Sequence, residues 1–393
     1  MRGGGNALQR KPKILILYAM FGDGHFQVAS ALKEQFRSEG RCDAVAVDIF
    51  AEAHPALNAL FRGLYRLSAA YFPRLYGWSY SWTRGMSPNG LFAVWLHSFG
   101  AGRLRTVLRR EKPDAVVHTF PFLALFRLRR RSGMELPGFT VVTDYELHNR
   151  WLHPDTDGYF VATEELRREL ASRGIRPDRV SVTGIPLRPD FQAAAAAAHG
   201  QQPDASPAGR VLVMAGGNGM LSEAKQVIDA LLSTGRGLEL VVVTGRSRRN
   251  FEALRRKYAG RPGVTVLGFA EEIWRLMASA ACLVTKAGGV TLAEAEALGL
   301  PAVVYRPLPG QERGNAAYLA KSGDLKIANT PAELAEAVVA QLGQPRTVRT
   351  AAALPAAQAV ASAVLQRIGE PRSDDARMPA RLGRQLAHDC SRP

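Results

Sequence analysis

Residues 285–296 read Thr285-Lys286-Ala287-Gly288-Gly289-Val290-Thr291-Leu292-Ala293-Glu294-Ala295-Glu296, and the rest of the chain is organised around this stretch. It follows the apolar run 282–284, which predicts the end of a buried strand, and it continues with the apolar spacing of a helix. Glycines at such a turn let the backbone approach a ligand, and the first amides of the helix are unpaired. The stretch therefore predicts a phosphate or diphosphate site at a strand-to-helix turn.

Glu294 lies one turn into that predicted helix. Its carboxylate can accept hydrogen bonds from two neighbouring hydroxyl groups, such as those of a ribose. The alternative is an ordinary strand-to-helix turn with a solvated glutamate, because Gly-Gly turns are common. We interpret the stretch as a site for a nucleotide diphosphate.

Length and charge limit the class of protein. The 393 residues predict two or three domains, and the net charge of +16 predicts an anionic partner: nucleic acid, acidic lipid or a phosphorylated substrate. Cys42, Cys282 and Cys390 have neither metal-ligand nor disulfide-framework spacing, which indicates a reducing compartment. We expect no signal peptide, because the apolar run Ile14-Leu15-Ile16-Leu17 is only as long as a strand. We also expect no membrane-spanning helix, because no apolar run approaches about 18 residues.

Strand, glycine turn and helix recur in both halves of the chain. Residues 13–18 lead through Phe21-Gly22-Asp23-Gly24-His25 into a helical pattern, and residues 211–214 lead into a second glycine turn that includes Gly219. This repetition predicts an α/β protein with two doubly wound, Rossmann-like domains and a cleft between them. The expected boundaries are a disordered start at 1–12, an N-terminal acceptor domain at 13–192, a linker at 193–209, a C-terminal nucleotide domain at 210–345, a helical segment at 346–369 and a disordered tail at 370–393.

His25 lies where the first glycine turn passes into the helix, at the carboxyl edge of the predicted sheet. One interpretation is a polar residue that caps the helix. The other is a general base, because the unperturbed pKa of imidazole suits removal of a proton from a hydroxyl group near neutral pH.

The segment 53–110 combines arginine with aromatic residues and contains no Asp or Glu. This mixture suits a surface that rests on an anionic bilayer, but it also suits a core with a solvated basic face, or single-stranded nucleic acid. We expect membrane contact through residues such as Trp78, Trp82, Arg84 and Trp95.

Other polar residues follow predicted strands. Asp144 and His148 come after the apolar run 139–143, and the spacing of His148 and His153 does not place them on one helical face, so a metal site is not expected. Gln311 and Glu312 open a helix, where they either bind sugar hydroxyls or cap the helix.

Together these motifs resemble the processive diacylglycerol glycosyltransferases and the plant monogalactosyldiacylglycerol synthases, which are inverting enzymes of the GT-B fold. The likeness extends over about residues 13–323. The matching motifs are Phe21-Gly22-Asp23-Gly24-His25, Thr143-Asp144-Tyr145, Gly184-Ile185-Pro186-Leu187-Arg188-Pro189, Gly216-Gly217-Asn218-Gly219, Thr285-Lys286-Ala287-Gly288-Gly289 with Thr291 and Glu294, and Pro309-Gly310-Gln311-Glu312 with Asn315.

The resemblance implies a role for each candidate residue. His25 would be the base beside the acceptor hydroxyl, and Asp144 and His148 would face the acceptor. In the UDP-sugar site, Gly288, Gly289 and Thr291 would hold the diphosphate, Glu294 the ribose, Arg246 and Phe269 the uracil, and Gln311 and Glu312 the sugar, with Gly219 nearby. The resemblance implies inversion without a metal or other cofactor, since helix amides can stabilise the diphosphate.

We therefore expect a peripheral enzyme on the cytoplasmic face of the cell membrane. It would transfer a hexose from UDP-glucose or UDP-galactose to 1,2-diacylglycerol, with anionic lipids as further partners and no nucleic acid. The alternative enzymes are a transferase to another lipid-linked acceptor and a GT-B UDP-sugar epimerase. The alternative outside enzymes is a basic nucleic-acid-binding protein.

Overall fold

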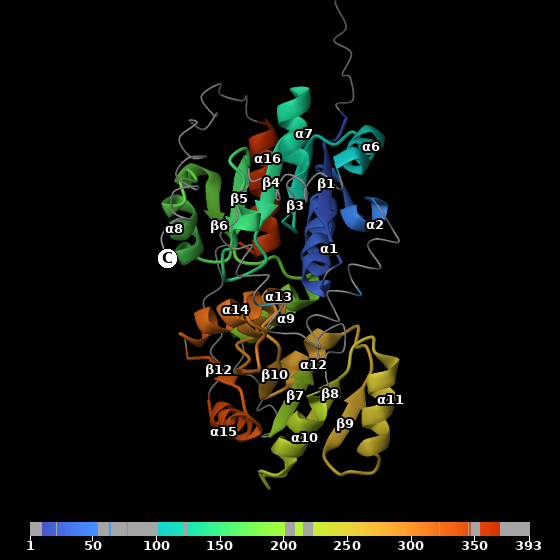
Figure 1. Cartoon of the computed structure of the whole chain (residues 1–393), viewed down its shortest axis with the longest axis vertical. Coiled ribbons are helices and arrows are strands. Elements are labelled where there is room, and N and C mark those ends of the chain that lie inside the picture. Colours follow the sequence, from blue (N-terminus) through green and yellow to red (C-terminus); the bar gives the residue numbers. More distant parts are fainter. Residues whose placement is uncertain are drawn as a thin grey trace, which may run out of the picture.

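A computed structural model of the chain describes residues 10–20, 22–53, 63, 77, 101–121, 124–200, 209–214, 223–321, 323–344, 346 and 354–369. These residues form two α/β units, each built on a six-stranded sheet, and Figure 1 shows the two units end to end. The predicted pair of doubly wound units is confirmed. Most of segment 53–110, the tail 370–393 and the first nine residues lie outside the described residues.

The N-terminal sheet has the strand order β2-β1-β3-β4-β5-β6, and all its strand pairs are parallel. Ile14, Leu15, Ile16 and Leu17 of β1 are at most 1% exposed, which explains the continuous apolar run, because a parallel sheet is covered on both faces. The strands are β1 (Lys13–Tyr18), β2 (Asp43–Asp48), β3 (Ala115–His118), β4 (Gly138–Val141), β5 (Gly158–Val161) and β6 (Val180–Val182). The helices of this unit are α1 (Asp23–Ser38), α2 (Ile49–Ala53), α6 (Ala101–Glu111), α7 (Ala124–Ser132), η1 (Asn149–Trp151), α8 (Glu164–Ser172) and η2 (Pro177–Arg179).

The C-terminal sheet repeats this plan with the order β12-β11-β10-β7-β8-β9, again with parallel pairs. Its strands are β7 (Arg210–Met214), β8 (Glu239–Val243), β9 (Val264–Leu267), β10 (Cys282–Thr285), β11 (Ala302–Tyr305) and β12 (Leu325–Ala328). Its helices are α10 (Ala224–Leu232), α11 (Arg248–Lys257), α12 (Ile273–Ser279), α13 (Gly289–Ala297), α14 (Gln311–Ala320) and α15 (Pro331–Leu342).

The strand orders identify one ligand-binding position in each sheet. The direction of winding reverses between β1 and β3 in the first sheet, and between β10 and β7 in the second. Ligands of open α/β sheets bind at the carboxyl ends of the strands beside such a reversal. His25, in the first turn of α1 after β1, and Gly288, in the turn after β10, lie at these two reversals.

Two further helices connect the units. Residues 189–200 form α9 (Pro189–Gly200), so part of the segment that we interpreted as a linker is helical, as expected for an alanine run because alanine has the highest helix propensity. The last described helix, α16 (Ala356–Gly369), returns to the N-terminal unit. Its buried residues Val360 and Val364 belong to the same core as Leu32 and Phe36 of α1.

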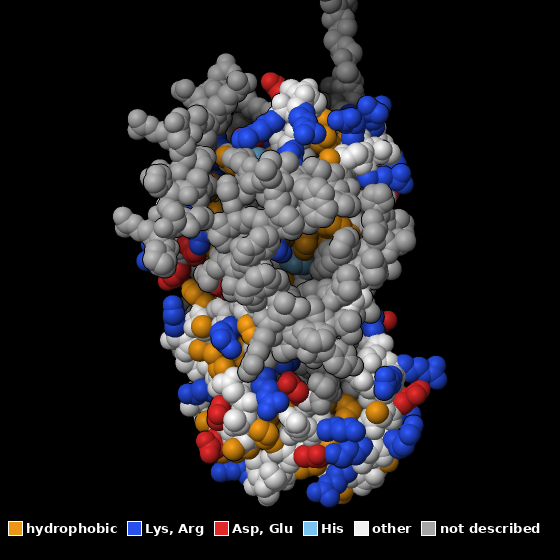
Figure 2. Space-filling model, in the orientation of Figure 1, with side chains coloured by type: hydrophobic (Ala, Val, Ile, Leu, Met, Phe, Trp, Pro, Cys, Tyr) orange, Lys and Arg blue, Asp and Glu red, His pale blue; other side chains and the backbone are white. Residues whose placement is uncertain are grey.

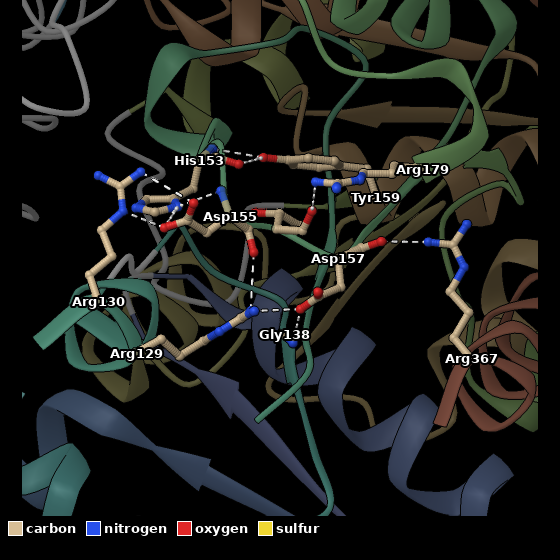
Figure 3. Close-up of polar contacts among 10 residues, drawn as sticks. Arg129, Arg130, Gly138, His153, Asp155, Asp157, Tyr159, Arg179 and Arg367 are labelled. Atoms are coloured by element: carbon tan, nitrogen blue, oxygen red, sulfur yellow. Dashed lines mark hydrogen bonds and ion pairs between the residues drawn. The ribbon is translucent and has the colours of Figure 1, made fainter. Parts of the chain in front are cut away.

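The C-terminal end of α16 is anchored at the amino ends of β5 and β6, and Figure 3 shows the contact before β5. Arg367 donates hydrogen bonds to the carbonyl oxygens of Asp157 and Asp178, at 2.5 and 2.6 Å. The Asp157 carboxylate in turn accepts from Arg129 of α7 at 2.6 Å and from the backbone amide of Gly138 at 2.8 Å. This anchor lies opposite the carboxyl edge of the sheet and therefore leaves the ligand-binding edge free.

Basic side chains gather over α6 and α7 of the N-terminal unit and over α11 of the C-terminal unit (Figure 2). The exposed arginines of the first group are Arg103, Arg105, Arg109 and Arg110 of α6 and Arg130 and Arg131 of α7. In the described ranges, every helix is too short or too polar to cross a membrane.

Candidate functional site

The two glycine turns predicted from the sequence meet at the junction of the units. A Cβ built on Gly24, beside His25, would lie 3.2 Å from a methyl group of Val290 in α13. A Cβ built on Gly289 would overlap the carbonyl oxygen of Thr143, whose side chain contacts His25. The base predicted from the first half and the phosphate site predicted from the second half therefore belong to one interface.

The hydrogen bonds of His25 fix which ring nitrogen is basic. Nδ1 lies 2.7 Å from the carbonyl oxygen of Thr119 and 3.1 Å from Oγ1 of Thr143. A carbonyl oxygen only accepts, so Nδ1 carries the proton and Nε2 has the free lone pair. The rings of Phe120 and Trp151 flank the imidazole, with centroids 5.0 and 6.1 Å away.

Burial at this interface lowers the pKa of His25 below 6.5, while the negative charge of Asp144 and the hydrogen bond to Thr119 oppose that shift. The imidazole is therefore neutral at physiological pH. A neutral imidazole with a free Nε2 at the carboxyl edge of the sheet can remove a proton from a hydroxyl group.

Asp144 and His148, which we predicted to face the acceptor, are both only 4% exposed. The carboxylate of Asp144 accepts hydrogen bonds from Gln311 at 2.5 Å and from Asn315 at 3.2 Å, both on α14 of the other unit. Nδ1 of His148 accepts from the backbone amide of Arg150 at 3.0 Å and caps η1. The chain after β4 thus lies in the interface between the units, where Asp144 accepts hydrogen bonds from the C-terminal unit.

The start of α13 has the form expected of a diphosphate site. Gly288 precedes the helix in an extended conformation, and no side chain caps the first amides. These amides carry the partial positive charge of the helix N-terminus. Thr291 lies in the same first turn, with its hydroxyl oxygen 3.9 Å from the Cβ position of Gly288.

Glu294 is buried on the same helix, with 6% of its surface exposed. Burial raises the pKa of its carboxyl group to about 7, although the positive charge of Arg188 opposes the shift. Within the described part of the chain it has no hydrogen-bond partner. An unpaired buried carboxyl group is costly, and ligand hydroxyl groups would relieve that cost.

Arg246 and Phe269, the predicted uracil pair, lie together. The guanidinium carbon of Arg246 is 4.4 Å from the centre of the Phe269 ring, and the ring is 49% exposed. Arg246 also forms an ion pair at 2.8 Å with Asp23 of α1. The C-terminal unit is thus linked to the turn that carries His25.

The two residues predicted to hold the sugar have different partners. Gln311 contacts Asp144, as described above. Glu312 accepts a hydrogen bond from the backbone amide of Leu308 at 2.8 Å and so caps the turn before α14. The other candidates, Gly219, Trp78, Trp82, Arg84 and Trp95, lie outside the described residues.

Three residues of the site were not assigned a role from the sequence: Thr119, Thr143 and Asn315. Thr119 and Thr143 follow the carboxyl ends of β3 and β4. A polar residue within two positions of the end of a buried parallel strand is the signal that points to Thr119 and Thr143. In the described ranges, His, Cys, Asp and Glu side chains nowhere form a group of three that could hold a metal ion.

The direction of winding reverses once in each sheet. The predicted base His25 lies at one reversal and the uncapped start of α13 at the other, and this arrangement defines a protein of the GT-B class. Residues 25–187 match the family model for monogalactosyldiacylglycerol (MGDG) synthase, and residues 210–365 match the glycosyltransferase family 28 C-terminal domain. A processive diacylglycerol beta-glucosyltransferase of Bacillus mycoides (strain KBAB4) is 34% identical over 332 residues, which cover 83% of this chain and 84% of the relative. A protein of the same name from Bacillus cytotoxicus is 33% identical over 340 residues, with 86% and 87% covered. The chain belongs to the processive diacylglycerol beta-glucosyltransferase family, as its motifs predicted.

Solved structures share the fold. MurG of Acinetobacter baumannii superposes with a TM-score of 0.55 at 17% identity and covers 91% of this chain and 99% of its own. A putative UDP-N-acetylglucosamine 2-epimerase of Listeria monocytogenes gives a TM-score of 0.57 at 16% identity, with 92% and 98% covered. Transferases and epimerases share this fold, so the fold alone does not identify the family. The sequence relatives identify it.

Proposed function

We propose that the protein transfers a hexose from a UDP-sugar to 1,2-diacylglycerol with inversion, giving a β-glycosyl diacylglycerol. The observation that carries the proposal is the meeting of His25, with its free Nε2, and the uncapped start of α13 at one interface. The relatives are named as beta-glucosyltransferases, so UDP-glucose is the donor that we propose.

In this proposal the donor lies along the C-terminal unit. The amide of Gly289 and the hydroxyl group of Thr291 bind the diphosphate, and Gly288 shapes the turn that leads to them. Glu294 accepts hydrogen bonds from the ribose, and the burial of its carboxyl group with no hydrogen-bond partner among the described residues supports this role. The exposed face of Phe269 stacks on the uracil beside Arg246.

The proposed chemistry is a single displacement at C1 of the hexose. Nε2 of His25 takes the proton of the acceptor hydroxyl while the acceptor oxygen forms a bond to C1. The bond from C1 to the diphosphate oxygen breaks on the opposite face, so the configuration inverts. The Thr119 carbonyl and the charge of Asp144 stabilise the imidazolium, and the α13 amides stabilise the charge on UDP.

We propose further that transfer needs no divalent cation, because the α13 amides supply positive charge at the diphosphate. Transfer at an undiminished rate in EDTA is the expected result. A loss of transfer that Mg²⁺ or Mn²⁺ restores would contradict the proposal.

The proposed location is the cytoplasmic face of the membrane, where the basic surface of α6 and α7 would contact anionic lipids. Its six exposed arginines, described above, support this orientation. Each basic residue near an anionic surface contributes about 1 kcal/mol of attraction.

The test is to identify the product. Purified protein is incubated with labelled UDP-glucose or UDP-galactose and vesicles that contain diacylglycerol, and the glycolipid is analysed by mass spectrometry and by NMR for the anomeric configuration. A β-hexosyl diacylglycerol is expected. Transfer to a polyprenyl-linked acceptor only would support the other transferase, and an epimerised UDP-sugar formed without acceptor would support the epimerase.

A further inference from the structure

Asn315 joins the two units at the site, although no role is assigned to it by the proposed reaction. It lies on α14 and is 0% exposed. Its side-chain oxygen accepts a hydrogen bond from the backbone amide of Tyr145 at 2.8 Å. Its side-chain nitrogen donates to Asp144 at 3.2 Å and to the carbonyl oxygen of Ala287 at 3.1 Å. Both donors and the acceptor of the amide are therefore used, and they connect residues 143–146 with the residue before Gly288-Gly289.

The surface that receives residues 143–146, which we call the interface loop, is shaped by two glycines. A Cβ on Gly289 would overlap the Thr143 carbonyl oxygen, and a Cβ on Gly314 would overlap the carboxyl group of Glu146 and lie 2.9 Å from its Cβ. The backbone of α13 and α14 thus has room for the loop only because side chains are absent at these positions.

The opposite side of the interface loop contacts the base. Thr143 lies 3.1 Å from Nδ1 of His25, and the next residue, Asp144, is bound by Asn315. The loop therefore contacts both the start of α13 and His25. A displacement of the loop would change the position of the imidazole relative to the diphosphate site.

We propose that Asn315 is a positioning residue: it fixes the interface loop against the C-terminal unit and thereby holds His25 in line with the donor. The kinetic consequence of this inference rests on the proposed function. A misplacement of about 1 Å costs on the order of 100-fold in rate, so the effect falls on kcat rather than on binding of the nucleotide.

Asn315→Asp is the sharpest variant, because it keeps the shape of the side chain and removes both donors. Its carboxylate would face the Asp144 carboxylate and the Ala287 carbonyl, so the loop would be repelled. We expect kcat to fall roughly 100-fold, with the Kd for UDP and the KM for the UDP-sugar within about threefold of wild type. Asn315→Ala, which removes the contacts without adding charge, should lose kcat to a smaller extent.

Gly314→Ala tests the same loop without changing a hydrogen bond. The added methyl group overlaps Glu146, so we expect a loss of kcat, and Glu146→Ala in the same chain should restore at least half of that loss on a logarithmic scale. This rescue would assign the loss to the overlap with Glu146, since a defect within α14 itself would not be repaired by truncating Glu146.

Small-angle X-ray scattering of each variant with saturating UDP measures the arrangement of the units independently of transfer. A larger radius of gyration for Asn315→Asp than for wild type is expected. An unchanged kcat for Asn315→Asp, measured beside an active preparation of wild type, would overturn the inference. A raised KM for the UDP-sugar with unchanged kcat would also overturn it, because Asn315 would then contact the UDP-sugar. If wild type itself transfers no hexose, the proposed function fails, while the scattering result still decides whether Asn315 fixes the loop.

Discussion

Replacing Glu294 with glutamine should make the protein more stable and a poorer binder of UDP. In the folded chain the pKa of Glu294 is raised from 4.5 to about 7 by burial. A carboxyl group with a raised folded pKa stabilises the fold below its unfolded pKa, and that contribution is lost as the pH rises through the folded pKa. The penalty of the ionised group is therefore absent near pH 4.5 and complete near pH 8.

The size of the penalty follows from the shift. At about 1.4 kcal/mol for each pKa unit, the rise from 4.5 to about 7 corresponds to about 3 kcal/mol at pH 8. Glu294→Gln removes the charge and keeps the shape. For a unit of about 150 residues, a gain of this size raises the Tm by roughly 6–12 °C.

The same change removes the charged acceptor of the proposed ribose hydrogen bonds. A hydrogen bond to a charged group contributes about 1.5–3 kcal/mol, so the Kd for UDP should rise roughly 10- to 150-fold. Thermal unfolding at pH 4.5 and pH 8 and calorimetric titration with UDP measure the two effects. A Glu294→Gln variant that is less stable than wild type at pH 8 would contradict the cost of the buried charge, and one that binds UDP as tightly as wild type would contradict the ribose contact.

Three further predictions concern the base, the uracil pair and the membrane surface. The acid limb of the pH profile of kcat/KM should have its midpoint below 6.5, because burial lowers the pKa of His25, and Asp144→Asn should move it lower still by removing the opposing charge; a midpoint above 6.5 would contradict this. Arg246→Ala should raise the Kd for UDP roughly 2- to 30-fold, whereas Arg248→Ala, a matched control whose exposed side chain pairs with Glu252 within α11, should leave it unchanged; equal effects would argue against the uracil role. Replacing Arg105, Arg109 and Arg131 with glutamine should weaken sedimentation with anionic vesicles roughly 100-fold, and the same change at Arg255 and Arg256 of α11 should have little effect; the reverse order would place the membrane surface elsewhere.

The fold was predictable because its signals are local. The run Ile14, Leu15, Ile16 and Leu17 is apolar throughout, since β1 is covered on both faces, and glycines follow both β1 and β10. Buried parallel strands and the turns at their carboxyl ends therefore give the order of elements in both units. The helix at residues 189–200 was harder to predict, because an alanine run suits both a helix and a linker.

Part of the site was predictable in the same way. Gly288 and Gly289 lie at a strand-to-helix turn, and His25 and Glu294 lie early in the helices that follow β1 and β10, so the strands determine the positions of all four. What the sequence did not indicate is which residues of the two halves touch. Asp144 and Gln311 are separated by 167 positions, and their hydrogen bond depends on how the units meet.

The protonation of His25 also depends on the assembled structure. The carbonyl of Thr119, 94 positions away, determines which ring nitrogen is basic. Burial of Glu294 is a similar case, because its helix alone would leave one face in solvent. The local sequence pattern thus identifies the candidate residues, and the packing of the two units determines their protonation.

The most direct test of His25 as the general base is the turnover of His25→Asn beside that of His25→Ala. Asparagine can still donate a hydrogen bond to the Thr119 carbonyl but has no basic nitrogen, so it separates the position of the side chain from its role as a base. Both variants should lose roughly 100- to 10,000-fold in transfer of hexose to diacylglycerol and should bind UDP with the Kd of wild type. Transfer by His25→Asn at the rate of wild type would show that His25 is not the base.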